Sequence, residues 1–356
     1  MTREEELWKK DYEQFTDATR KFYAKEMDTK TYKGISGNFG SYAQRGAASN
    51  MLRLRLPGGR LTKEKFGFIV DAIEKYGIDK AHFTTCQAIQ LHNLSETTVT
   101  ELAPAALSVG IVTRGGGGDN PRNTMMSPLA GVEKGEYFSV VPYALAVGDF
   151  AMKFITMPKM PRKLKIAFSN TKENIPHATF RDMGFVARED GLFDVYAAGG
   201  LGNKPLLGVL VKEAVDPKEI LYYVEAMHTL FCKYGDYENR AHARTRFLQE
   251  ICGGVDAFRE KFLLEVEEAK KGEDLTLTPE RLASSMAGVP CEKCSSGKAA
   301  KATPDDSVLS RRVIEQKQKG LYAVKYHPIG GNPDLKDFRA LYETILEMDK
   351  VECRVA

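Results

Sequence analysis

The sequence has no apolar run long enough to cross a bilayer, for which about 20 residues are needed. Its most apolar stretch, residues 137–157, is interrupted by Asp149 and Lys153, and we interpret it as a core helix. The N-terminus, "MTREEELWKKDYEQF", lacks the apolar centre of a signal peptide and is charged and amphipathic. These absences predict a protein without a membrane span, located in the cytoplasm.

Cysteine is scarce and scattered. The six cysteines are Cys86, Cys232, Cys252, Cys291, Cys294 and Cys353. Their spacing is not that of a disulfide framework and fits a reducing compartment. Cys291 and Cys294 form one C-x-x-C, but no second pair lies at the spacing of a metal site. A solvated loop is therefore favoured over a pair of metal ligands.

The chain also lacks a strong excess of either charge. It has 51 Lys and Arg against 48 Asp and Glu, which gives a formal net charge of +3. This balance argues against a globally basic nucleic-acid-binding protein, so any anion site has to be local. The length of 356 residues fits two or three domains, or one large fold with a sizeable core.

The first third of the chain alternates strand and helix patterns. In "MLRLRLPGG" apolar and basic residues alternate, so that Arg53 lies opposite the leucine face of a strand. After an amphipathic helix at 3–27, the predicted order is strand, helix, strand, strand and helix, at 51–59, 62–76, 81–85, 88–93 and 97–108. This order is that of a ferredoxin-like unit.

The middle of the chain predicts a second, α+β block. A long helix is expected at 137–156, before any of the strands of this block. The expected strands are at 163–169, 184–188, 193–197 and 206–212, and the later helices are at 217–233, 239–251 and 255–270. Residues 271–308 are rich in Lys, Ala, Ser and Pro, and we interpret them mostly as a linker.

After this segment the chain repeats an earlier pattern. "LYAVKYHPIGGNPDLKDFRALYETILEMDKVECRV" follows "NMLRLRLPGGRLTKEKFGFIVDAIEKYGIDKAHFT" in its strand, Gly-Gly turn, amphipathic helix and second strand. Gly58 and Gly59 match Gly330 and Gly331, and Arg53 matches Lys325 by the same shift. A single repeat of this length indicates a duplicated domain rather than a solenoid.

Four basic residues stand out in separate motifs: Arg53, Arg122, Lys163 and Lys165. The two lysines share one face of a predicted strand and repel each other unless a negative charge lies between them. Taken singly, each residue is also explained by a solvent-facing or loop position. Convergence on one small anion explains the whole set, because Arg forks and Lys point charges together hold a dianion.

The glycine run in "TRGGGGDNPRN", residues 113–123, permits a competing interpretation. Its backbone N–H groups could cradle a phosphate, although it fits neither a P-loop nor a dinucleotide-binding motif. "AAGGLGNK", residues 197–204, is equally unspecific. Glycines also allow a large flat cofactor to approach the backbone.

Seven motifs then occur in order: "MLRLRLPGGRLT", "FTTCQAIQLH", "GGDNPRN", "MPRKLKIAFSN", "DMGFVA", "GLFDVYAAGGLG" and "ENRAHARTRF". Over about residues 30–270 the chain resembles the siroheme-containing nitrite and sulfite reductases, and its restart near residue 313 resembles their second repeat. The resemblance implies an α+β fold with a pseudo-twofold duplication. A ferredoxin-like half-domain is followed by an α+β siroheme-type domain and then by the start of a second half-domain.

Five parts are expected on this basis. They are an N-terminal helix (1–29), a first ferredoxin-like half-domain (30–110), an α+β siroheme and substrate domain (111–270), a linker (271–308) and an incomplete second half-domain (309–356).

The family reduces sulfite to sulfide, or nitrite to ammonia, with six electrons at a siroheme coupled to a [4Fe–4S] cluster. The resemblance implies sulfite or nitrite as substrate and an electron donor such as ferredoxin or a flavoprotein, without a nucleic-acid or membrane partner. Carried over by motif, the oxyanion-binding, catalytic residues are Arg53, Arg122, Lys163 and Lys165. Sulfite is favoured because both lysines of the K-x-K motif are present, with nitrite as the alternative.

The resemblance also implies siroheme contacts. These candidate residues are Thr84, Cys86, Gln87, Gln90, His92, Asn120, Arg244 and Arg246. Cys86 departs from the family, in which arginine is common at this position. The departure predicts weaker siroheme binding, or a contribution from a neighbour such as His82, which is otherwise explained as an exposed strand residue.

The C-x5-C and C-x3-C motifs that hold the cluster in the family do not occur in this sequence. We therefore expect the first part of a longer two-repeat protein, with the cluster ligands in the part beyond it and no activity of this chain alone. The alternative is a non-catalytic fragment that binds a tetrapyrrole or an anion without turnover.

Overall fold

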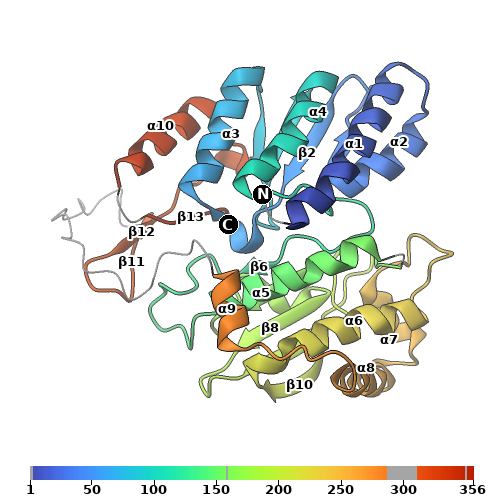
Figure 1. Ribbon diagram of the computed structural model, residues 1–356. Helices are drawn as coiled ribbons and strands as arrows, with labels where there is room; N and C mark the ends of the chain where they lie inside the picture. The colour runs from blue at the N-terminus through green and yellow to red at the C-terminus, as the bar shows by residue number, and fades with distance from the viewer. Residues whose placement is uncertain (1–2, 158, 287–310, 349–350) are drawn as a thin grey trace.

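The computed structural model describes residues 3–157, 159–286, 311–348 and 351–356. They form two units, each with its own β-sheet and helices, and the C-terminal segment returns to the first unit (Figure 1). The α+β class predicted from the sequence is confirmed. Within this described part, no helix is both long and apolar enough to span a membrane.

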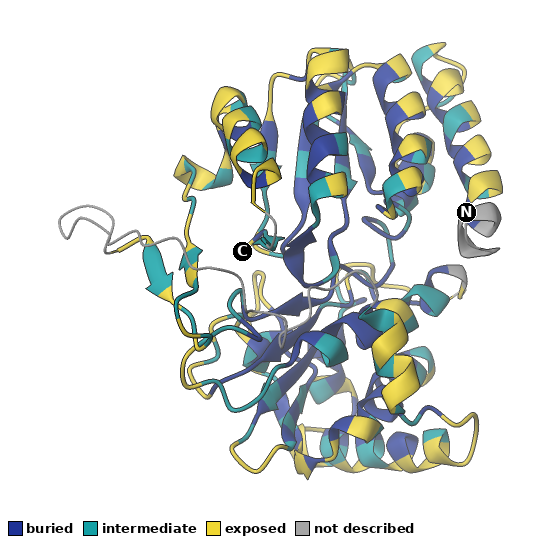
Figure 2. Cartoon of the chain, turned by 60° about the vertical axis from the view of Figure 1, so that its left-hand side comes forward, coloured by how far each residue is buried: buried dark blue, intermediate teal, exposed yellow. Residues whose placement is uncertain are grey.

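The first unit contains a four-stranded antiparallel sheet in the order β1-β2-β5-β4. Its strands are β1 (Ser41–Ala43), β2 (Asn50–Leu54), β4 (Ala81–Phe83) and β5 (Ile89–Leu94). Its helices are α1 (Arg3–Tyr23), α2 (Thr29–Ser36), α3 (Lys63–Tyr76) and α4 (Glu96–Ala105). The helices present buried stripes to the sheet and exposed residues to the outside (Figure 2). The predicted order from β2 to α4 is confirmed.

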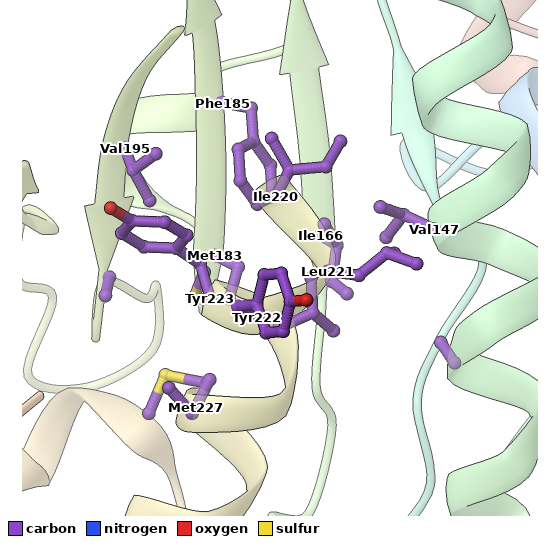
Figure 3. Packing of buried hydrophobic residues seen from close by; sticks show 14 of the residues in the cluster. Val147, Ile166, Met183, Phe185, Val195, Ile220, Leu221, Tyr222, Tyr223 and Met227 are labelled. Atoms are coloured by element: carbon purple, nitrogen blue, oxygen red, sulfur yellow. The ribbon is translucent and has the colours of Figure 1, made fainter. Parts of the chain in front are cut away.

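The second unit contains a five-stranded sheet in the order β10-β9-β8-β7-β6, parallel from β6 to β8 and antiparallel from β8 to β10. The strands are β6 (Met125–Met126), β7 (Ile166–Ser169), β8 (Met183–Ala187), β9 (Phe193–Ala197) and β10 (Val209–Val215). The helices are α5 (Val141–Met152), α6 (Ile220–Tyr234), α7 (Leu248–Ile251), α8 (Val255–Lys270) and α9 (Pro279–Ser285). Figure 3 shows side chains of α6 packed against the strands and against Val147 of α5.

Several predicted helices are shorter than expected, and the one at 137–156 forms an α-helix only in α5. The helix at 3–27 ends at Tyr23, and Asp28 caps a separate helix, α2, by accepting the N–H groups of Lys30 and Thr31 at 2.8 and 3.0 Å. The helix expected at 239–251 is wrong over most of its length, because only α7 forms there. The Asn239 side chain accepts a nearby backbone N–H and favours a turn in its place.

The linker expected at 271–308 begins later than predicted. Leu275 and Leu277 are 4% and 2% exposed and belong to the core of the second unit. Helix α9 then packs against α5. Residues 287–310, which include Cys291 and Cys294, lie outside the described residues.

The repeat is visible in the backbone of its turns. Gly58 has φ 62° and ψ 16°, and Gly330 has φ 59° and ψ 21°, so both Gly-Gly turns share the left-handed conformation that glycine accepts without strain. The second copy contains β12 (Tyr322–Val324), α10 (Leu335–Leu346) and β13 (Cys353–Arg354). β12 pairs with β11 (Val313–Glu315), which precedes it. β13 pairs with β3 (Arg60–Leu61) of the first copy, and α10 packs beside α3.

Candidate functional site

The glycine-rich segment at residues 114–118 is bound by three arginines through its carbonyl groups. Arg55 donates to Arg114 O at 3.0 Å, Arg53 donates to Gly116 O at 2.6 Å, and Arg122 donates to the carbonyls of Gly115, Gly117 and Gly118 at 3.3, 2.6 and 2.8 Å. Every carbonyl of the segment therefore accepts a guanidinium N–H. Burial lowers the pKa of both Arg55 and Arg122 to about 10. Repulsion from Arg122 lowers the pKa of Arg55 further, and repulsion from Arg53 lowers that of Arg122.

The need for glycine in this segment comes from close packing within the chain. A Cβ atom at Gly117 would lie 2.3 Å from Gly37 O, and one at Gly118 would lie 2.3 Å from Asn38 Oδ1. The N–H groups are also in use, since Gly116 donates to Thr113 O and Gly118 donates to the Tyr42 hydroxyl, both at 2.8 Å. The alternative of a phosphate cradle built from these N–H groups is therefore wrong.

Arg53 lies on the face of the first sheet that is opposite the leucine face. Gln90 is its cross-strand partner, and the Gln90 amide oxygen accepts from Arg53 Nη2 at 2.6 Å and from Nε at 3.2 Å. The other polar atom of this amide lies 3.3 Å from His92 Nε2. Burial lowers the pKa of His92, and the positive charges of Lys80, His82 and Arg53 lower it further. Arg53, Gln90 and His92 thus form one connected group.

Lys163 and Lys165 lie beside Arg122. The Arg122 N–H donates to Leu164 O at 2.7 Å, so that "NPRN" runs parallel to "RKLK". Burial lowers the pKa of Lys163, and the charges of Arg122, Arg244 and Lys165 lower it further. Both lysines precede β7 instead of lying within it, which corrects the predicted strand limits. Neither lysine is ion-paired with a carboxylate among the residues that the structure describes.

Asp182 is a buried carboxylate that sequence reasoning missed. It is 1% exposed, accepts the N–H of Lys165 at 2.9 Å and the hydroxyl of Thr245, and lies 3.5 Å from Arg244 Nη2. It therefore joins "RKLK", residues 162–165, which we call the lysine segment, to the motif "ARTRF". The available signal was its position directly before the apolar strand "MGFVA", where a carboxylate has to be buried.

Arg244 and Arg246 carry unused hydrogen-bond donors. Arg246 is 4% exposed, donates from Nη1 to Leu201 O at 3.1 Å and stacks over the Phe247 ring at 4.6 Å. The Nε atoms of both arginines are buried and have no partner within the described ranges. Buried donors of this kind are costly unless they meet an acceptor, so the pair fits an acidic ligand.

The residues between β4 and β5 form a turn. The strand predicted at 81–85 ends at Phe83, and Thr84 Oγ1 accepts the N–H groups of Cys86 at 3.3 Å and Ala88 at 3.1 Å. Gln87 has φ 57°, and its amide exchanges two hydrogen bonds with the backbone of Met126, at 2.9 and 3.0 Å. The side chains of Thr84 and Gln87 are therefore engaged within the chain.

Cys86 and Asn120 lie at the edge of the group of arginines that bind the glycine segment. Cys86 is half-buried and is close enough to Arg53, Arg122 and Arg181 to act on the pKa of each, which burial lowers. Asn120 donates to Asn38 Oδ1 at 2.9 Å and to Gly117 O at 3.0 Å, so it supports the glycine segment.

The structure brings most of the predicted site residues together, but some of their side chains are already bonded within the chain. His82 faces the second copy, with Nδ1 at 3.1 Å from Asn332 Oδ1. Within the described part of the chain, no group of three or more His, Cys, Asp or Glu side chains is arranged to hold a metal ion.

Comparison with known proteins matches two segments of the chain. Residues 42–109 match the nitrite/sulfite reductase ferredoxin-like half domain, and residues 117–271 match the nitrite and sulphite reductase 4Fe-4S domain. A ferredoxin–nitrite reductase of Leptolyngbya laminosa is 29% identical over 218 residues, 59% of this chain and 42% of that protein. Sulfite reductase [ferredoxin] 2 of Mycolicibacterium paratuberculosis is 30% identical over 229 residues, 62% of this chain and 40% of that protein.

The chain thus spans about two-fifths of the length of these relatives. Among solved structures, the NirA protein of Mycobacterium tuberculosis has the same fold, with a TM-score of 0.70 and 24% identity over 92% of this chain and 59% of that one. The first matched segment falls in the first unit and contains Arg53. The second falls in the second unit and contains Arg122, Lys163 and Lys165. The chain therefore belongs to the nitrite and sulfite reductase family.

Proposed function

We propose that the chain provides the anion-binding cations and part of the siroheme pocket for the six-electron reduction of sulfite to sulfide or of nitrite to ammonia. The observation that carries this proposal is the packing of Arg122 against the lysine segment, which gathers Arg122, Lys163 and Lys165 without an ion-paired carboxylate among the described residues. Arg122 is buried, Lys165 is partly buried and Lys163 is exposed. Like charges gathered in this way repel one another and are stabilised by a bound dianion. Arg53 completes the set from the first unit.

Each of these residues has a distinct role in the proposal. Arg53 and Arg122 are held by carbonyl groups, so their charges are fixed in place and stabilise the negative charge that develops during reduction. Lys163 has a lowered pKa, which makes its ammonium a better proton donor. Release of water from the oxyanion consumes such protons.

Siroheme, when bound, supplies the iron at which the oxyanion is reduced, and a [4Fe–4S] cluster supplies electrons to it. The buried Nε donors of Arg244 and Arg246 fit its carboxylates, as does the group of Arg53, Gln90 and His92. The named relatives support ferredoxin as the electron donor.

Sulfite is the preferred substrate in this proposal. Sulfite is largely a dianion near neutral pH whereas nitrite is a monoanion, so a second lysine adds more to the binding of sulfite. The test compares wild type with Lys165→Asn in the 356-residue chain, produced in cells that make siroheme. Lys172→Asn, an exposed lysine on another surface, is the matched control.

We expect Lys165→Asn to keep its siroheme absorbance and to lose about tenfold to a hundredfold in sulfite affinity, with a smaller loss for nitrite. Calorimetric titration with each anion and the absorption spectrum are measured on one preparation. Equal losses for both anions would remove the preference for sulfite. Loss of siroheme would assign Lys165 to the cofactor, and an unchanged affinity would leave both lysines as solvated surface residues.

A further inference from the structure

The N-terminal helix α1 reaches the glycine segment through Tyr12. This residue is 1% exposed, and its hydroxyl oxygen accepts the N–H groups of Thr113 at 3.0 Å and Arg114 at 3.1 Å. It also shares a 2.8 Å hydrogen bond with Thr113 Oγ1. One phenol therefore fixes Arg114, the first residue of the segment, and Thr113, the residue before it.

Arg114 is held to the same helix by its side chain. Its Nε donates to Asp11 Oδ2 at 2.9 Å, and its guanidinium lies 4.8 Å from the centre of the Phe39 ring. Phe39 in turn stacks on Phe15 of α1 at 5.0 Å. The backbone and the side chain of Arg114 are thus both positioned by α1.

The contacts continue from Arg114 to the cations of the site. The Arg114 carbonyl accepts from Arg55, and the next four carbonyls, at 115–118, accept from Arg122 and Arg53. A shift of the segment would therefore move the acceptors that hold both guanidinium groups. Tyr12 is thus connected to Arg122 by hydrogen bonds through the backbone of residues 113–118.

We propose that α1 belongs to the positioning machinery of the anion site, with Tyr12 as a positioning residue that sets the glycine segment and, through it, Arg53 and Arg122. Tyr12 lies outside both segments that match the family, 42–109 and 117–271. The effect on anion binding rests on the proposed function, whereas the effect on the segment does not.

The test compares Tyr12→Phe with Tyr32→Phe in the full chain. Tyr32 is a matched control, because it is fully buried and its hydroxyl bonds Asn50 Oδ1 at 3.0 Å, away from the glycine segment. The readout is amide hydrogen exchange at Gly116 and Gly118, neither of which bonds to Tyr12. We expect about tenfold faster exchange at both amides in Tyr12→Phe alone.

A second readout is the NMR signal of the Arg122 Nε–H, which should shift in Tyr12→Phe and stay in place in Tyr32→Phe. Calorimetric titration with sulfite should give a dissociation constant about three- to tenfold weaker for Tyr12→Phe. If the wild type does not bind sulfite, the proposed function fails, and exchange at Gly116 and Gly118 still decides the positioning role.

Asp11→Asn is a second variant that keeps the buried core intact, and it should raise exchange at the same two amides to a smaller extent. Equal exchange at Gly116 and Gly118 in the wild type, Tyr12→Phe and Asp11→Asn would overturn the proposal.

Discussion

Phe66 and Phe338 occupy equivalent positions in the two copies of the repeat, and their rings contact each other with centroids 4.5 Å apart. The Gly-Gly turns make a second reciprocal contact. A Cβ at Gly59 of the first copy would meet Val355 O of the second copy at 2.2 Å, and a Cβ at Gly331 of the second copy would meet Phe83 O of the first at 2.7 Å. The two copies are therefore related by a local twofold axis that passes between the two rings.

Truncation of this ring pair should destabilise the contact between the copies. Phe338 is 1% exposed, so Phe338→Ala should lower the free energy of unfolding by about 3–5 kcal/mol. Ile329 lies in the same copy but is 94% exposed, and Ile329→Ala should change stability by less than about 0.5 kcal/mol. Urea unfolding of both variants checks this; similar midpoints would argue against the packing of α10 on α3.

The predicted organisation of the repeat follows from signals that act locally. Paired glycines, an amphipathic helix and alternating strands are set by neighbouring residues, so the pattern at Gly58 and Gly330 could be identified from the sequence. The pairing of β13 with β3 is set by contacts across almost the whole chain, and periodicity carries no information about it.

A side chain at Gly117 should disrupt the arginine-bound segment. Its Cβ would lie 2.3 Å from Gly37 O and 2.5 Å from the Tyr42 hydroxyl, neither of which can move freely. Gly117→Ala should lower stability by about 1–3 kcal/mol and weaken sulfite binding. Gly34→Ala is the control, because no atom lies within 4 Å of its Cβ in α2, and it should raise stability by about 0.5–1 kcal/mol. Thermal unfolding distinguishes them, and a tolerated Gly117→Ala would contradict the packing.

The lowered pKa of Lys163 predicts how anion binding depends on pH. The ammonium attracts an anion only while protonated, so sulfite affinity should fall as the pH rises through this lowered pKa, before an ordinary lysine titrates. Folding responds in the opposite direction: the unfolded chain binds this proton more tightly, so the group makes the folded state more stable as the pH rises.

Titration with sulfite from about pH 8 to about pH 10, where the anion itself no longer changes charge, checks this expectation. Lys163→Arg is the control, since arginine keeps its charge and should hold the affinity level across the range. A parallel decline in both proteins would assign the pH dependence to another group.

Removal of the Asp182 charge should loosen the lysine segment. Asp182→Asn keeps the shape but loses the charge that orders Lys165, Thr245 and Arg244, at a cost of about 1.5–3 kcal/mol in stability. Asp190→Asn removes a carboxylate from an exposed pair with Arg188 and should change stability much less. Chemical denaturation measures both, and equal losses would mean that burial of Asp182 adds nothing.

Asp182 also shows why the site could be predicted only in part. The four cations belong to motifs that resemble those of a known family, so they could be predicted from the sequence. They are Arg53, Arg122, Lys163 and Lys165. Arg53 and Arg122 are bonded to backbone carbonyls, and the Asp182 carboxylate bonds the backbone N–H of Lys165 from a distant part of the chain. A list of residue types does not reveal such backbone partners. Gln87 also belongs to a motif and was therefore predicted to contact the cofactor, but in the structure its amide is bonded to the backbone of Met126.

The binding of arginines by neutral carbonyls has a consequence for the kinetics of anion capture. An arginine held by a carboxylate has to break an ion pair before it can accept a new anion, whereas Arg53 and Arg122 are bonded to carbonyls and to no carboxylate in the part of the chain that the structure describes. Their guanidinium groups are held in place before any anion arrives, and the nearby Asp119 carboxylate partly offsets the effect of burial, which lowers the pKa of Arg122. Association should therefore be fast, with a rate that falls steeply as ionic strength increases.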